Sequence, residues 1–113
     1  MGRVNKYHNI KIWYKGIKFD SIKEMKRFKE LEFLQNADYI CFLERQKKFL
    51  LQEGYTNKAG QKIRPIYYIA DFYYFNIEKG EWIVEDTKGV KTDVYKLKKK
   101  LFEKKYNLSI KEL

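Results

Sequence analysis

The chain is poor in cysteine, histidine and proline, and it has no long apolar run. Because Cys41 is the only cysteine, an internal disulfide cannot form, and an oxidising compartment is not indicated. One cysteine and one histidine, His8, cannot supply a structural zinc site. The apolar runs are shorter than the roughly 20 residues of a transmembrane helix, and the first residues lack a signal-peptide core. We therefore expect a cytoplasmic protein that does not enter a membrane.

Lysine and arginine, in contrast, are in large excess. The 113 residues include 25 Lys and Arg against 15 Asp and Glu, which gives a net charge of +10. The hydrophobic fraction of 44% and the aromatic fraction of 18% are typical of a globular protein, not of a disordered one. Such a positive excess usually indicates a polyanionic partner, because binding releases counterions from phosphates. We expect nucleic acid; the alternatives are a membrane surface or no specific partner.

Turn and capping residues predict the first elements of the fold. The pattern around Lys15-Gly16 in residues 10–19 is typical of a short hairpin. Ser21 followed by Glu24 is a capping box, which predicts a helix that runs to about Asn36.

The rest of the chain predicts several strands and a second helix. Residues 66–77 are dense in β-branched and aromatic side chains, which favours a strand, and Glu78-Lys79-Gly80 predicts a tight turn. The elements expected after the first helix are strands over 40–52, 66–77 and 81–87, a hairpin tip over 55–62, a helix over 93–106 and a short edge strand within 108–113. This order is that of an α+β protein, or of an α/β protein if the last strand pairs in parallel. We expect one domain over 1–113, in which 1–19 form an N-terminal arm and hairpin.

Two aspartates lie in the strands on either side of the tight turn. A turn centred between Glu78 and Lys79 would place Asp71 opposite Asp86, with Cβ atoms about 4.5–5.5 Å apart, whereas a bulge at Gly80 would shift this register by one residue. Side chains alternate along a strand, so Lys88 shares the face of Asp86. Two ionised carboxylates this close repel each other, which raises one pKa or recruits a cation. The neighbouring residues are mostly apolar, where an unpaired charge is costly.

We therefore expect a divalent cation at Asp71 and Asp86, with Lys88 beside it. Oxygen ligands of this kind suit Mg²⁺, and Mn²⁺ can take its place. Such an ion lowers the pKa of a bound water and stabilises charge on a phosphate. Lys88 can position the attacking water or neutralise the developing charge. The alternative is structural: both aspartates lie on a solvated sheet face, and Lys88 forms a cross-strand ion pair.

Glu24 also has two interpretations. As the third residue of a capping box it needs no further role, and this is the better explanation from the helix alone. Glu24, Phe28 and Leu31 nevertheless follow i, i+4, i+7 spacing, so they share the helix face that should pack on the sheet. That placement would bring the Glu24 carboxylate towards the two aspartates.

This pattern resembles the PD-(D/E)XK nuclease superfamily, in which an acid on the first helix precedes an aspartate and an acid-x-Lys motif on successive strands. The matching residues are Glu24, Asp71 and Asp86-Thr87-Lys88. The stretches 16–21, 68–72, 84–89 and 91–95 are similar to a family of small phage proteins of this superfamily. Ala70 stands where the superfamily often has a proline. Of the two neighbouring acids, Asp86 fits the motif because it lies two residues before Lys88, whereas Glu85 points to the other face.

The resemblance implies a restriction-endonuclease-like core and a Mg²⁺-dependent DNA endonuclease. It assigns catalytic roles to Glu24, Asp71, Asp86 and Lys88, with the three acids as metal ligands. Cutting selective for DNA structure, including resolution of Holliday junctions, is an implied role. Relatives can carry a supporting glutamine near the site, and Gln46 is the candidate here; the alternative, which we prefer slightly, is an ordinary exposed strand residue.

The predicted C-terminal helix carries much of the basic charge. Residues 88–112 contain nine lysines. Val94, Leu97 and Leu101 are spaced to face the sheet, which would leave the lysines towards solvent. Lysine contacts phosphates as a point charge without reading bases. The lysines expected to bind nucleic acid are Lys91, Lys96, Lys99, Lys100 and Lys104.

Three functions remain open from the sequence. The first is a metal-dependent DNA endonuclease, the second a non-catalytic nucleic-acid-binding module of the same fold, and the third a small basic protein that bridges other phage components. A pure binder gains nothing from clustered acids beside DNA, which favours the first. Because one unit offers one site and two cuts need two, we expect a symmetric homodimer.

Overall fold

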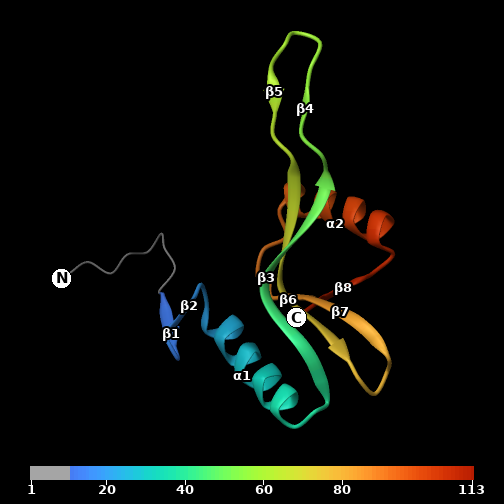
Figure 1. Ribbon diagram of the computed structural model, residues 1–113. Helices are drawn as coiled ribbons and strands as arrows, with labels where there is room; N and C mark the ends of the chain where they lie inside the picture. Colours follow the sequence, from blue (N-terminus) through green and yellow to red (C-terminus); the bar gives the residue numbers. More distant parts are fainter. Residues whose placement is uncertain (1–10) are drawn as a thin grey trace, which may run out of the picture.

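The computed structural model describes residues 11–113, and this part of the chain folds as α+β, as predicted. Two helices, α1 (Ile22–Asn36) and α2 (Asp93–Tyr106), pack on a four-stranded sheet (Figure 1). The sheet order is β3-β6-β7-β8, with strands β3 (Ile40–Gln52), β6 (Ile66–Asn76), β7 (Glu81–Asp86) and β8 (Ile110–Glu112). Two hairpins complete the fold, β1–β2 (Ile12–Tyr14 and Ile17–Phe19) and β4–β5 (Tyr55–Thr56 and Lys62–Ile63).

The predicted order of elements is confirmed. The last strand, β8, does pair in parallel with β7, but the β3–β6 and β6–β7 pairs are antiparallel, so the sheet is mixed and the fold is α+β. The expected N-terminal arm, residues 1–10, lies outside the described residues. Between residues 11 and 113, neither helix is long and apolar enough to cross a membrane.

Helix α1 begins and packs as its sequence predicts. The Ser21 hydroxyl accepts a hydrogen bond from the Glu24 amide at 3.1 Å, which caps the helix. The buried residues of α1 are Glu24, Phe28 and Leu31, the predicted stripe. A carboxylate is therefore part of an otherwise apolar buried face, and it needs polar partners there.

Helix α2 has the predicted ends but buries a different face. Thr92 caps it and Asn107, in the left-handed conformation, ends it, both as expected. The prediction that Val94, Leu97 and Leu101 face the sheet is wrong, since these side chains are 63%, 59% and 45% exposed.

The buried residues of α2 are aromatic. Tyr95 and Phe102 are buried, and Tyr106 packs beside them. These three residues also follow helical spacing, at i, i+7 and i+11. The Phe102 ring lies 4.8 Å from that of Phe49 on β3, centroid to centroid. Aromatic rings bury more area than valine or leucine and gain from edge-to-face packing, so the aromatic face was selected over the aliphatic one.

This packing makes Phe102→Ala a strongly destabilising change. Phe102 is fully buried, so we expect a loss of about 3–5 kcal/mol in the free energy of unfolding. Leu97→Ala, on the exposed face of the same helix, is the matched control and should change it by less than about 0.5 kcal/mol. Urea unfolding measures both. A larger loss in Leu97→Ala than in Phe102→Ala would contradict the observed orientation of α2.

The hydrophobic core has two parts that lie on opposite faces of the sheet. Val84 of β7 packs in the cluster with α2, whereas its neighbour Glu85 bonds to Arg27 of α1. Along β6, Tyr68 and Ala70 belong to the α2 cluster, whereas Phe72 and Tyr74 belong to the α1 cluster.

The change of cluster occurs at Asp71, between Ala70 and Phe72. On the neighbouring strand, Arg45 pairs with Phe72 and Lys47 with Ala70, so Gln46 lies beside Asp71. Gln46 has a φ of +52°, a left-handed conformation that interrupts the regular alternation of β3. At Gln46 and Asp71, therefore, the alternate side chains of the sheet stop packing in the α2 cluster and begin to pack in the α1 cluster.

Candidate active site

Asp71 and Asp86 come together as the strand register predicts. Phe72 pairs with Glu85 on the neighbouring strand, which puts Asp71 beside Asp86 at the next position along. Both line an open pocket of about 230 Å³. These two aspartates come from the middle of β6 and the end of β7. The lining residues are Asp20, Ser21, Glu24, Asp71, Asp86, Thr87 and Lys88.

Asp86 is fully buried and only partly satisfied. Its Oδ2 accepts a hydrogen bond from the Tyr68 hydroxyl at 2.7 Å. Its Oδ1 has no hydrogen-bond partner and lies 3.4 Å from Nζ of Lys88. Burial raises the pKa of Asp86 to about 6, and the charge of Asp71 adds to this rise, although the Tyr68 hydrogen bond opposes it. A buried carboxylate oxygen that accepts no hydrogen bond is an unusual and costly arrangement.

Asp71 is held in place by its neighbours. Its Oδ2 accepts hydrogen bonds from the Thr87 amide at 2.8 Å and from the Thr87 hydroxyl at 2.6 Å. Its Oδ1 accepts from Nε2 of Gln46 at 3.3 Å. Three donors, two from Thr87 just after β7 and one from Gln46 of β3, fix this carboxylate, and they leave it half-buried at the edge of the pocket.

Gln46 joins Asp71 to Glu24. The same Nε2 that contacts Asp71 donates to Oε2 of Glu24 at 3.2 Å, and Arg45 lies 3.5 Å from that oxygen. Burial raises the pKa of Glu24, and the charge of Asp71 raises it further. Gln46 is an exposed strand residue, as the preferred alternative stated, but its amide contacts two acids of the pocket, which that alternative did not include. The Glu24 amide donates to the Ser21 hydroxyl at the helix cap, whereas the Glu24 carboxylate contacts Gln46 and Arg45 at the site. The capping bond therefore explains the amide, and only the second interpretation explains the carboxylate.

Lys88 projects towards the pocket from the segment after β7. Its Nζ pairs with Asp86 and lies 5.4 Å from the centre of the Tyr95 ring on α2. The side chain is about one-third exposed, at 36%, so the ammonium group remains accessible to a ligand that enters the pocket.

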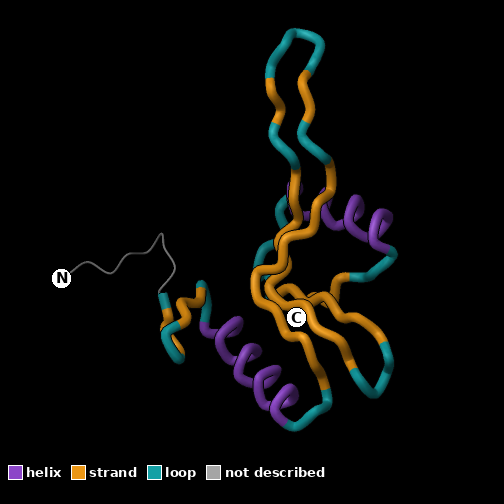
Figure 2. The backbone as a smooth tube through the Cα atoms, viewed as in Figure 1, coloured by secondary structure: helices purple, strands orange, loops and turns teal. Residues whose placement is uncertain are grey.

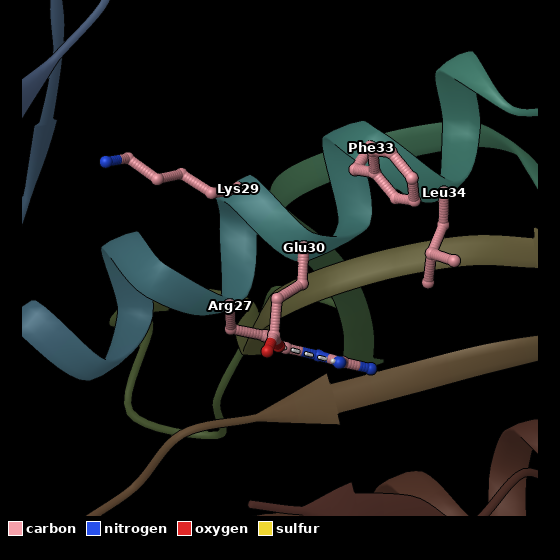
Figure 3. A pocket seen from close by; sticks show the side chains of 5 residues that line it. All are labelled: Arg27, Lys29, Glu30, Phe33 and Leu34. Carbon is pink, nitrogen blue, oxygen red and sulfur yellow. Dashed lines mark hydrogen bonds and ion pairs between the residues drawn. The ribbon is translucent and has the colours of Figure 1, made fainter.

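A larger hollow, of about 510 Å³, lies along α1 (Figure 3). It is lined by Arg27, Lys29, Glu30, Phe33 and Leu34. Its acid, Glu30, is exposed and pairs with Arg27 at 3.0 Å. Because this hollow has no buried acid and no unpaired polar atom, we place the chemistry in the smaller pocket.

The lysines expected to bind nucleic acid fall into two groups. Lys96, Lys100 and Lys104 are exposed, as predicted. Lys91 and Lys99 each lie 3.3 Å from a carboxylate oxygen of Glu112 on β8. The Tyr95 hydroxyl, which donates to Glu112, and these two lysines lower the pKa of Glu112. The pairing of these lysines with Glu112 was not predicted, because this acid lies on a different element, so the free positive charge near α2 is smaller than predicted.

The residues present are compatible with a divalent cation held by two carboxylates. Within residues 11–113, no three Asp, Glu, His or Cys side chains are grouped to hold a metal ion, so a cage of three protein acids is not formed. Mg²⁺, however, is commonly bound by one or two carboxylates, with waters and substrate phosphate as the other ligands. Asp71 and the Oδ1 of Asp86, which accepts no hydrogen bond, provide such a pair.

Sequence reasoning missed the residues that hold the acids. Tyr68, Thr87 and Arg45 bond or pair with Asp86, Asp71 and Glu24 respectively. Regular alternation would put Tyr68 and Asp71 on opposite faces of β6. Only the change of buried face at Asp71 brings the Tyr68 hydroxyl to Asp86, and no sequence signal marks that change.

Fold and pocket together define a small α+β protein with a buried acidic pair, a lysine and a glutamine where two halves of its core meet. The chain belongs to the family described as protein of unknown function (DUF1064), which matches residues 4–112. No curated protein and no solved structure matches the chain.

Proposed function

We propose that this protein is a metal-dependent endonuclease that hydrolyses phosphodiester bonds in DNA. The observation that carries the proposal is the buried Asp86, whose Oδ1 accepts no hydrogen bond and lies 3.4 Å from Nζ of Lys88 in an open pocket that Asp71 also lines. A protein that needed these acids only for its fold would gain stability by replacing them, because buried like charges repel. The net charge of +10 supports a polyanionic substrate.

Asp71 and Asp86 would hold Mg²⁺ or Mn²⁺, and Glu24 would complete the acidic site. When bound, such an ion lowers the pKa of a water and stabilises negative charge on the phosphate. Both aspartates must be ionised to hold it. The raised pKa of Asp86, about 6, still leaves this carboxylate mostly ionised at neutral pH.

The other side chains of the site would neutralise charge on the substrate and hold the carboxylates in position. Lys88 is the only accessible cation that lines the pocket, so it would contact the scissile phosphate or the attacking water. Gln46 holds the Glu24 and Asp71 carboxylates near each other with one amide group. Tyr68 fixes one oxygen of Asp86, which leaves the other for a ligand.

DNA as the substrate, and branched or four-way-junction DNA in particular, follows from the resemblance to PD-(D/E)XK nucleases. Lysines that contact only phosphates favour recognition of DNA shape over sequence. Two symmetric cuts in a junction require two sites, so we propose a homodimer as the working form.

The test is cleavage of labelled linear duplex, flap and four-way-junction DNA in Mg²⁺ or Mn²⁺. We expect cutting by the wild-type chain and a loss of at least about 100-fold in rate for Asp86→Asn, since metal binding and charge stabilisation both depend on it. Asp38→Asn, at an exposed acid in the turn after α1, is the matched control and should cut like the wild type. Tight DNA binding without cutting of any substrate would instead identify a non-catalytic binding module.

A further inference from the structure

Residues 53–65 form an arm that projects from the sheet. β3 and β6 extend side by side past the strand β7, and the chain between them ends in the β4–β5 hairpin. Neither helix reaches the tip of this hairpin (Figures 1 and 2). The radius of gyration is 17.0 Å, against about 13 Å for a compact chain of this length. An arm that buries so little adds little to stability, so its shape calls for another explanation.

The tip of the arm is built as a fixed turn. The Asn57 side-chain oxygen accepts hydrogen bonds from the amides of Ala59 and Gln61, at 3.0 and 2.9 Å. Its backbone oxygen accepts from the Gly60 amide at 2.9 Å, and Gly60 has the positive φ that such a turn requires. These bonds all lie within residues 57–61, so the turn orders itself and a partner would not have to order it on binding.

The arm is also basic and unneutralised. Lys58, Lys62 and Arg64 are exposed, and none of them forms an ion pair with another residue of the described chain, whereas Glu53 is the only acid of the arm. A second copy of a chain with net charge +10 would be repelled by this surface. The charge pattern is complementary to a polyanion.

We propose that the arm binds the sugar–phosphate backbone of duplex nucleic acid, to one side of the cut. A two-stranded ribbon of this kind fits the major groove of a duplex. Arg64 and Lys62 precede Asp71 by seven and nine residues, which corresponds to about 23 and 30 Å along a strand. At about 3.4 Å per nucleotide, the arm meets the duplex about seven to nine base pairs from the acidic pocket. This position rests on the proposed function, but binding by the arm does not.

The test compares two triple variants of the full chain that lose the same charge. Lys58→Ala/Lys62→Ala/Arg64→Ala removes the cations of the arm. The control, Lys26→Ala/Lys79→Ala/Lys111→Ala, removes exposed lysines of α1, the β6–β7 turn and β8. Fluorescence anisotropy with a labelled 30-base-pair duplex in EDTA, over a range of salt concentrations, gives the Kd and its salt dependence without cleavage. Thermal unfolding of both variants should match the wild type, because all six side chains are exposed.

We expect the arm variant to have a Kd at least about 10-fold higher than that of the wild type. The plot of the logarithm of the association constant against the logarithm of salt concentration should become less steep by about 2 to 3, as for three lost phosphate contacts. The control should stay within about 3-fold. Equal Kd values for the two variants would overturn the proposal. So would an equal loss of affinity for poly-glutamate, which would indicate attraction to any polyanion, including an acidic protein.

If the arm variant lost affinity but the wild type cut no DNA, duplex binding by the arm would stand and the proposed nuclease function would fail. If the wild type cut DNA but the arm variant bound duplex as tightly as the wild type, the nuclease function would stand and binding by the arm would fail.

Discussion

Asp86→Asn should make the protein more stable, although it removes a fully buried acid. The pKa of Asp86 is about 6 in the folded chain, against 3.8 for an ordinary aspartate. The ionised group therefore costs about 3 kcal/mol of folding free energy at pH 8. Asparagine keeps an oxygen that can accept from Tyr68, and it carries no charge next to Asp71. We expect a gain of about 1–3 kcal/mol at pH 8, measured by urea unfolding.

The sign of the pH dependence gives a second check on the same variant. Because the folded pKa of Asp86 lies above its unfolded value, its contribution to stability is fully present below about pH 4 and is lost as the pH rises through about 6. The difference between Asp86→Asn and the wild type should therefore shrink towards zero at pH 4. Asp38→Asn should show no such difference at any pH. If Asp86→Asn were instead less stable than the wild type at pH 8, the Asp86–Lys88 pair would be structural, and the proposed function would lose its main support.

Arg27→Met should have a large effect of the opposite sign. Glu85, the neighbour of Asp86, is fully buried and accepts hydrogen bonds from Arg27 Nε at 2.8 Å and Nη2 at 2.6 Å. It also accepts a hydrogen bond from the Tyr74 hydroxyl. Removal of Arg27 leaves a buried carboxylate without its cation, which costs about 3–5 kcal/mol of unfolding free energy. Urea unfolding at pH 7 measures this loss.

Two further variants separate the charge from the packing. Arg27→Met/Glu85→Gln removes both charges of the pair and should recover a large part of the lost stability. Glu30→Gln, which removes only the exposed partner of Arg27, should change the free energy of unfolding by less than about 1 kcal/mol. A loss below about 1 kcal/mol in Arg27→Met itself would show that water or another group satisfies Glu85. Asp86 and Glu85 are thus adjacent buried acids with opposite effects on stability. Removing the charge of Asp86 should stabilise the chain, whereas removing the cation that pairs with Glu85 should destabilise it.

Local signals predicted most of the fold. Ser21 and Thr92 cap their helices as the sequence indicated, and the turn after β6 sets the register that brings Asp71 to Asp86. These features depend on residues close together in the chain, so their chemistry can be recognised without the tertiary structure.

The wrong or missing predictions concern features that depend on contacts between residues far apart in the chain. Helix α2 offers an aliphatic face with Leu97 and an aromatic face with Phe102, and the spacing of residues supports both. The ring of Phe49 on a distant strand decides between them. In the same way, Gln46 joins the site only because its left-handed conformation coincides with Asp71. Pairing of Glu112 with Lys91 and Lys99 depends on where β8 ends, which no local pattern predicts.

The division of the core at Asp71 has a consequence for how the molecule opens. Contiguous regions of a protein can unfold as separate cooperative units, each with its own free energy. Here one cluster contains α1 and the other contains α2, and β6 runs through both. Opening of the α1 cluster would withdraw Glu24 and leave Asp86 bonded to Tyr68 within the α2 cluster. The pocket is therefore complete only while both units are closed at once, so its population is limited by the less stable of the two.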